Sequence, residues 1–122
     1  MMPLNSNAVF LQLLGRRDAS VLALFRYNRV KLNHIAASKG GGGTALCPFC
    51  PGVTETVRHA LLDCPKYAVP RAECQQALRA MYVDFSYTVL LGAVDAHHVD
   101  RSKSALPRIV QYLCKIREIR GV

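Results

Sequence analysis

The sequence lacks any long apolar segment. No stretch approaches the roughly 18 uninterrupted apolar residues of a membrane helix. The first residues carry none of the cations that open a signal peptide, and the apolar run of residues 8–14 is interrupted by Gln12. These absences argue against membrane insertion and secretion, and they favour a cytoplasmic or nuclear protein.

Acidic residues are scarce, with 8 Asp and Glu against 16 Lys and Arg, and the net charge is +8. Residues 1–46 carry six cations against one acid, and so do residues 101–122, whereas residues 47–100 have a net charge of −2. Basic ends around a nearly neutral middle predict phosphate contacts made by the flanks. The alternative is that the cations only form solvated helix faces.

The residue patterns of several enzyme classes are missing. Gly40–Gly43 lead into Thr44 without the lysine of a phosphate-binding loop. Asp84 stands where a polymerase has its first carboxylate, but Phe85 replaces the second, so two metal ions could not be held. His97 and His98 lie in a polar stretch without further ligands nearby. The sequence therefore predicts a protein that is not an enzyme.

A complete set of metal ligands is present in Cys47, Cys50, His59 and Cys64. Three thiolates and one imidazole suit Zn²⁺, which in structural sites takes four sulfur and nitrogen ligands and keeps no open position. Two cysteines separated by two residues can face one ion across a tight turn, and Pro48 stiffens that turn. The pattern predicts one structural zinc.

Cysteines can also act as a redox pair or form disulfides. A redox dithiol expects a strand before the pair and a helix starting at it, but four glycines precede this pair and Pro51-Gly52 follow. Disulfides fit poorly, because five cysteines is an odd number and no secretory signal is seen. Cys74 and Cys114 lie in helical patterns and are predicted to be small buried hydrophobic residues.

Apolar spacing and capping residues predict a small all-α domain around this zinc knuckle. We expect three segments, 1–43 with basic helices and a glycine linker, 44–84 with the zinc module and 85–122 with a helical end, packed as one unit. Five helices are predicted. The first runs from Asn5 or Ser6 to Leu14, and the second from Asp18 or Ser20 through Ile35 toward Lys39. The third runs from Thr54 or Thr56 to Cys64, before Pro65, the fourth from Pro70 to Met81, and the fifth from about Ser104 to Arg120, before Gly121. Residues 85–94 suit either a short helix capped by Ser86 or a strand, and 95–104 a polar loop. In the last helix Pro107 falls in the first turn, and Ile119 extends the apolar face.

Residues 20–80 resemble the C-terminal zinc-binding region that follows the reverse transcriptase in non-LTR (LINE-type) retrotransposons, particularly fungal ones. The matching residues are Arg26, Leu32-Asn33, Cys47, Cys50, Glu55-Thr56, His59, Leu61-Leu62, Cys64-Pro65, Tyr67 and Arg71. The tetraglycine linker departs from that pattern, and the sequence contains neither polymerase nor nuclease.

The resemblance implies a module that binds RNA or DNA. Cys47, Cys50, His59 and Cys64 would then be the metal ligands, and the candidate phosphate contacts are Arg26, Arg29, Lys31, Arg58 and Arg71. The rival interpretation is a recruited protein-interaction module, such as a fungal virulence effector or regulator. A translated relic without a selected role is a third.

Overall fold

The computed structural model describes residues 14–38, 44–93 and 99–122, and within these ranges its regular elements are all helices, as the sequence predicts. One isolated antiparallel bridge joins Leu46 to Thr54. No helix in these ranges is long and apolar enough to cross a membrane. The elements are α2 (Arg16–Arg26), α3 (Asn33–Ser38), the π-helix η1 (His59–Asp63), the 3-10 helix η2 (Pro65–Tyr67), α4 (Ala68–Ala80), α5 (Tyr87–Leu90) and α6 (Val99–Arg120).

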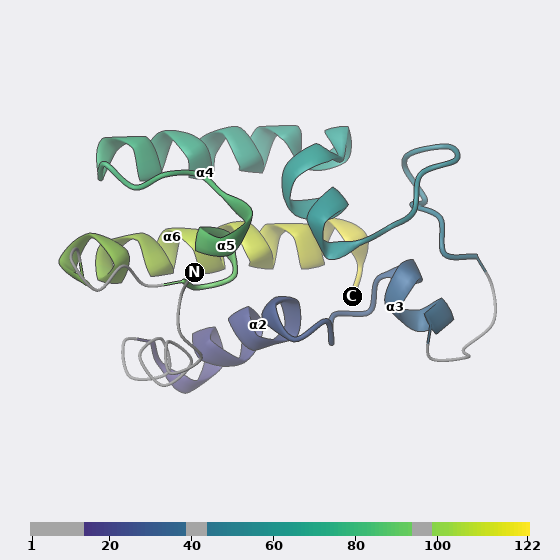
Figure 1. Ribbon diagram of the computed structural model, residues 1–122, viewed down its shortest axis with the longest axis horizontal. Coiled ribbons are helices and arrows are strands. Elements are labelled where there is room, and N and C mark those ends of the chain that lie inside the picture. The colour runs from purple at the N-terminus through teal and green to yellow at the C-terminus, as the bar shows by residue number, and fades with distance from the viewer. Residues whose placement is uncertain (1–13, 39–43, 94–98) are drawn as a thin grey trace.

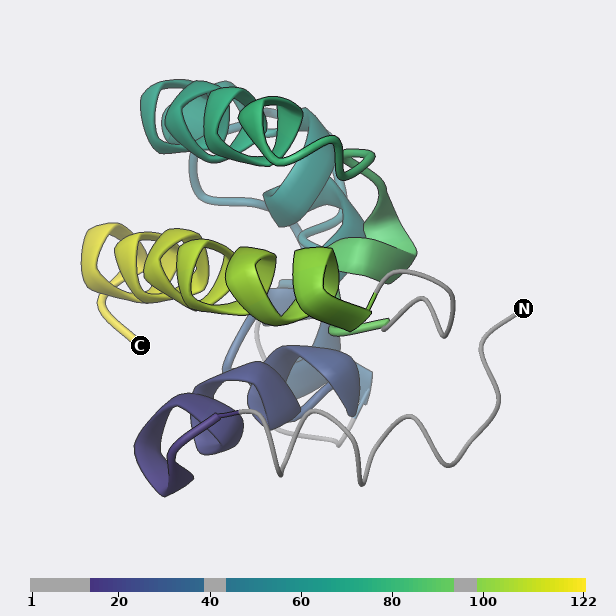
Figure 2. The same ribbon diagram turned by 90° about the vertical axis from the view of Figure 1, so that its left-hand side faces the viewer.

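Helix α6 lies between α4 on one side and α2 on the other, and both views show these three layers (Figures 1 and 2). Its apolar residues recur at three- and four-residue spacing and are almost fully buried, as expected of a helix covered on two sides. They meet apolar side chains from both neighbouring helices in one core. The main core residues are Leu22 and Phe25 of α2, Leu78 of α4, and Leu106, Ile109, Leu113 and Ile116 of α6.

The start of α6 differs from the prediction. The helix begins at Val99, so residues 99–104 are helical rather than loop, and Pro107 lies well inside the helix instead of in its first turn. Pro107 leaves the carbonyl of Lys103 without its helical partner, but both residues are exposed, so water can satisfy that group. At the other end Ile119 is 39% exposed rather than buried, and Gly121, at φ +82°, ends the helix as predicted.

The single helix predicted from residue 18 or 20 toward residue 39 is two helices. Asn28 adopts the left-handed conformation at φ 55°, and the backbone N–H groups of Arg29 and Val30 both donate to the Leu24 carbonyl, at 2.7 and 3.0 Å. This turn ends α2 and sends Val30 and Leu32 into the core, where 2% and 0% of their surface is exposed. Burial of both residues thus decides against a continuous helix.

Two elements after the knuckle were predicted only approximately. Helix α4 begins at Ala68, so Pro70 is its third residue rather than its first, still within the turn whose N–H groups have no helical partner. The ambiguous stretch contains the short helix α5, capped by Ser86, whose Oγ accepts from Val89 N at 3.3 Å. After α5, Gly92 has φ +90°, and a Cβ there would lie 2.6 Å from Leu22 Cδ2, so only glycine allows this close approach to α2.

Some predictions concern residues outside the described ranges. These are the first helix before Leu14, the glycine linker with Lys39, and the pair His97 and His98.

Candidate metal centre

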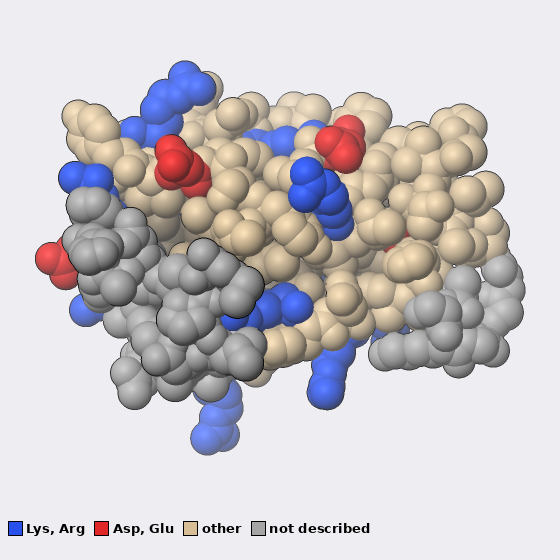
Figure 3. All heavy atoms as spheres, viewed as in Figure 1, with Lys and Arg blue, Asp and Glu red and all other residues tan. Residues whose placement is uncertain are grey.

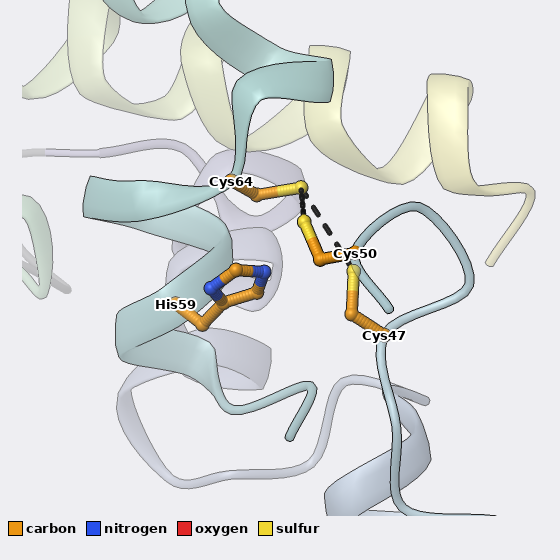
Figure 4. Close-up of side chains that lie close together, drawn as sticks. All are labelled: Cys47, Cys50, His59 and Cys64. Carbon is orange, nitrogen blue, oxygen red and sulfur yellow. Dashed lines mark hydrogen bonds between the residues drawn. The ribbon is translucent and has the colours of Figure 1, made fainter. Parts of the chain in front are cut away.

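The structure brings together the four residues that the sequence predicts as metal ligands. The ligand atoms of Cys47, Cys50, His59 and Cys64 all lie within 4.8 Å of one another, and all four residues are buried. Cys64 Sγ is 3.7 Å from Cys50 Sγ and 3.9 Å from Cys47 Sγ (Figure 4). These separations far exceed the roughly 2.05 Å of a disulfide, and the thiols are free. The four residues form a Cys3His site suited to a metal ion.

A tight hairpin presents the first two cysteines. Cys47 N donates to the Val53 carbonyl at 2.6 Å, and Glu55 N donates to the Ala45 carbonyl at 2.8 Å, which closes the segment between them. Within the turn, Cys50 N reaches back toward the Cys47 carbonyl at 3.4 Å. The backbone therefore holds Cys47 and Cys50 on the inner side of one turn, as the spacing predicts.

The other two ligands depend on a π-turn. In an α-helix, residues five apart are separated by about 140° around the axis, so His59 and Cys64 would point in different directions. Here Cys64 N donates to the His59 carbonyl at 2.8 Å, the five-residue bond of a π-helix, which places the two residues about one turn apart. Cys64 then becomes extended, with ψ 120°, before Pro65. The prediction that the helix stops at Cys64 is confirmed.

The orientation of His59 leaves one ring nitrogen for a ligand. Thr56 caps the helix start, because its Oγ1 accepts from His59 N at 3.0 Å, so Thr56 rather than Thr54 is the N-cap. The imidazole turns a nitrogen toward the sulfurs (Figure 4). Its Nε2 is buried and has no hydrogen-bond partner. A buried nitrogen without a partner is costly, and coordination to a cation would satisfy it.

Burial sets the protonation of the thiols. It raises the pKa of Cys64 to about 12, and it also raises the pKa of Cys50. Without a cation these thiols therefore stay neutral. A divalent ion among them reverses that preference, because it stabilises the thiolate directly.

Arg71 supports the π-turn from α4. Its Nη2 donates to the carbonyls of Cys64 at 2.8 Å and Ala60 at 3.1 Å, and its Nε donates to the Leu61 carbonyl at 2.9 Å. The hydroxyl of Tyr112, from α6, donates to the same Leu61 carbonyl at 2.7 Å. Together these donors satisfy carbonyls that the irregular helix leaves open. The role of Tyr112 had no signal in the sequence.

Glu55 joins the knuckle to the start of α3 and the end of α6. Its side chain is 1% exposed and forms a salt bridge with Arg120, whose Nε lies 2.7 Å from Glu55 Oε2. Asn33 N donates to Glu55 Oε1 at 2.6 Å, and Arg120 Nη2 donates to Asn33 Oδ1 at 3.0 Å. The sequence gives no signal of this buried network, because Arg120 is 65 residues away from Glu55.

Comparison with known protein families, curated proteins and solved structures finds no match for this chain.

The predicted phosphate contacts fall into two groups. Arg29, Lys31 and Arg58 are exposed, without an acidic partner among the described residues. Arg26 and Arg71 are partly buried, and each donates to backbone carbonyls; Arg26 Nη1 reaches Leu91 O at 3.0 Å. Arg26 and Arg71 therefore have structural contacts that the sequence did not predict.

The two cysteines outside the metal site differ in exposure. Cys74 is buried, as predicted, whereas Cys114 is partly exposed, because it lies at the edge of the buried face of α6.

Proposed function

We propose that the Cys3His site holds one Zn²⁺. A regular tetrahedron with zinc–sulfur bonds of about 2.3 Å has edges of about 3.8 Å. The two sulfur–sulfur distances in the site, 3.7 and 3.9 Å, agree with that edge. With four protein ligands such a zinc keeps no open position, so its role is structural rather than catalytic.

Elemental analysis of the purified protein with reduced thiols tests this assignment. We expect one zinc per chain, released as the pH falls below about 6, because protons compete for thiolate and imidazole. No zinc, or two zinc ions per chain, would contradict it.

We further propose that the protein binds nucleic acid. The observation that carries this proposal is the position of the exposed cations. Arg29 and Arg58 come from distant parts of the sequence and line one surface groove, and no described lining residue is acidic. Lys31 is exposed close by in the chain. Figure 3 shows Lys and Arg side chains also projecting along the edge that α2 forms. Such a field attracts a phosphate backbone.

Zinc would position one side of this surface. The metal site holds η1, and residue 58 directly precedes His59. The backbone N–H of His34 donates to the Glu55 carbonyl at 3.3 Å, which ties the start of α3 to the same segment. Loss of zinc would therefore loosen the segment that presents Arg58.

The proposed lineage is the C-terminal region of a retrotransposon reverse transcriptase. The residues that carry the resemblance make defined contacts around the metal site, which supports a shared fold motif. Asn33 Nδ2, for example, donates to the Leu46 carbonyl at 2.7 Å, and Tyr67 is 1% exposed beneath the knuckle, with its ring edge-on to Phe49 at 6.0 Å.

Fluorescence anisotropy with labelled RNA and DNA across about 50 to 300 mM salt tests nucleic-acid binding. Log affinity should fall with log salt at about −0.7 per contact for single strands and −0.9 for duplexes. Replacing Arg29, Lys31 and Arg58 together by glutamine should weaken binding and flatten the slope by about two units, with the zinc content unchanged.

The matched control replaces Lys103, Arg108 and Lys115 by glutamine. All three are exposed on α6, so this variant loses the same charge elsewhere on the surface. We expect it to retain most of the affinity. If both triple variants lose binding equally, the exposed cations at the groove are not the site.

Protein binding is the second candidate function, and one observation favours it. Two large apolar side chains are strongly exposed: Tyr82, just after α4, is 81% exposed with a left-handed backbone at φ 58°, and Val69, at the start of α4, is 73% exposed. A zinc-loaded wild type that binds neither RNA nor DNA at micromolar concentration in low salt would favour this function.

A further inference from the structure

The groove that contains Arg29 and Arg58 is also aromatic. Its described lining includes Tyr27 and Arg29 from the turn after α2, His34 from α3, Arg58 before η1 and Tyr87 from α5. Its volume is about 450 Å³, and it is open to solvent. Small-molecule sites range over about 300–1,000 Å³, so the groove has room for part of a nucleotide chain. Cations with flat rings suit a ligand that carries both negative charge and flat rings.

Tyr27 is exposed and Tyr87 is partly buried, and both rings lie against guanidinium groups. Tyr27 is 46% exposed, with the Arg26 guanidinium 6.0 Å from its ring centroid. Across the groove, the Arg58 guanidinium lies 5.4 Å from the centroid of Tyr87. Nucleobases stack both on aromatic rings and on arginine planes, so these pairs offer two stacking positions.

Helix ends rather than long loops hold both walls. Tyr27 N donates to the Ala23 carbonyl at 3.0 Å, and the left-handed Asn28 fixes the direction of Arg29. On the other wall, Arg58 lies in the turn capped by Thr56. Groups that are already ordered lose little entropy on binding, which favours affinity.

We propose that this groove is a binding site for single-stranded nucleic acid, in which bases stack on Tyr27 and Tyr87 while Arg29 and Arg58 contact phosphates. The proposal rests on the nucleic-acid binding proposed above and adds the strand form. Bases of a duplex are already stacked on one another and cannot reach the rings, whereas those of a single strand can.

The first experiment compares Tyr27→Ala with wild type in anisotropy titrations of an RNA strand, a DNA strand and a DNA duplex, each of about 12 nucleotides per strand. Wild type should bind the single strands more tightly than the duplex. Loss of one stacking ring should weaken single-strand binding roughly tenfold. Duplex affinity should not change, and Tyr27→Phe, which keeps the ring, should restore single-strand binding.

Tyr82→Ala is the matched control, because Tyr82 is an exposed tyrosine with an arginine, Arg101, 5.8 Å from its centroid, but it lies outside the groove. This variant should bind like wild type. The comparison of the RNA and DNA strands shows which backbone the groove prefers.

A second measurement does not depend on truncating a side chain. The sequence contains no tryptophan, so Tyr27→Trp introduces a single reporter in the groove and Tyr82→Trp a single reporter outside it. Base stacking should quench the emission of Tyr27→Trp on addition of an RNA or DNA strand. Inorganic polyphosphate, which has no bases, should not quench the emission of Tyr27→Trp. The emission of Tyr82→Trp should not change on addition of nucleic acid or polyphosphate.

Four results would overturn the proposal. Nucleic-acid binding without a preference for single strands, or an equal loss of affinity in Tyr27→Ala and Tyr82→Ala, would remove the groove as the site but leave the proposed function standing. Unquenched emission of Tyr27→Trp at saturating RNA and DNA would do the same. Absence of binding to all three nucleic acids would remove both.

Discussion

At the scale of single residues, burial of a thiol has opposite consequences for the cysteines inside and outside the metal site. Burial raises the pKa of Cys74 to about 11 and that of Cys64 to about 12, so both resist ionisation on their own. Of the two, only Cys64 has neighbours among the described residues that could share a cation with it. The same burial thus makes Cys74 an inert packing residue and makes Cys64 depend on the metal.

Substitution of these two cysteines should have very different costs. Structural zinc contributes about 10 kcal/mol or more, which is comparable to the whole stability of a small domain, so Cys64→Ser should lose both zinc and fold. Cys74→Ala should cost about 1–2 kcal/mol through lost packing and keep its zinc. Thermal melts with parallel zinc analysis measure both. Indistinguishable melts would refute the ligand assignment.

The buried hydroxyl of Tyr112 should make the stability of the fold depend on alkaline pH. Burial raises the pKa of its hydroxyl from about 10 to about 12. Between these values the unfolded chain releases a proton that the folded chain retains, so the free energy of unfolding should fall as the pH rises above about 9. Cys74 acts in the same direction. In Tyr112→Phe the fall between pH 9 and 11, measured by urea unfolding, should be shallower, and an equal fall would contradict the prediction.

At the scale of elements, the π-helix η1 is an irregular segment whose carbonyls need outside donors. Arg71 of α4 donates to two of them, those of Ala60 and Leu61, and to the Cys64 carbonyl just after η1. Tyr112 of α6 donates to the Leu61 carbonyl. The packing of α4 and α6 against η1 therefore also sets the positions of His59 and Cys64. The metal site is held by the helices as well as by the knuckle.

Arg71→Met should consequently destabilise the domain by about 3 kcal/mol, because partly buried carbonyls lose charged donors. It should also weaken zinc binding, since η1 carries two ligands. Arg79→Met is the control, an exposed arginine on the same helix, and should change stability by less than about 0.5 kcal/mol. Urea unfolding and zinc competition with a chelator measure the two effects. Equal results for the two variants would rule out the support role.

At the scale of the whole molecule, the Glu55 network joins the zinc knuckle, the start of α3 and the end of α6. Glu55 is far more buried than Arg120, with 1% and 18% of their side chains exposed. Removing the Arg120 guanidinium alone therefore leaves the buried Glu55 carboxylate without its main partner. Removing both charges leaves only uncharged polar groups.

A double-mutant cycle tests this coupling. Arg120→Met should cost about 3 kcal/mol, and Glu55→Gln somewhat less, because an amide can still accept from Asn33 N. The double variant should cost less than the sum of the two. Glu73→Gln, an exposed acid on α4, should be nearly neutral. Additive costs in urea unfolding would show that the salt bridge is not an energetic link.

By itself the sequence determined the features that depend on neighbouring residues. The ligand set with its spacing, the apolar faces of α4 and α6, the Ser86 cap and the stops at Cys64 and Gly121 all follow from periodicity or from the backbone limits of proline and glycine. Only the tertiary structure decided the break at Asn28, the early start of α6, the π-turn and the roles of Arg71, Tyr112 and Arg120. These depend on burial and on hydrogen bonds between residues up to 87 positions apart, and no local pattern encodes such contacts.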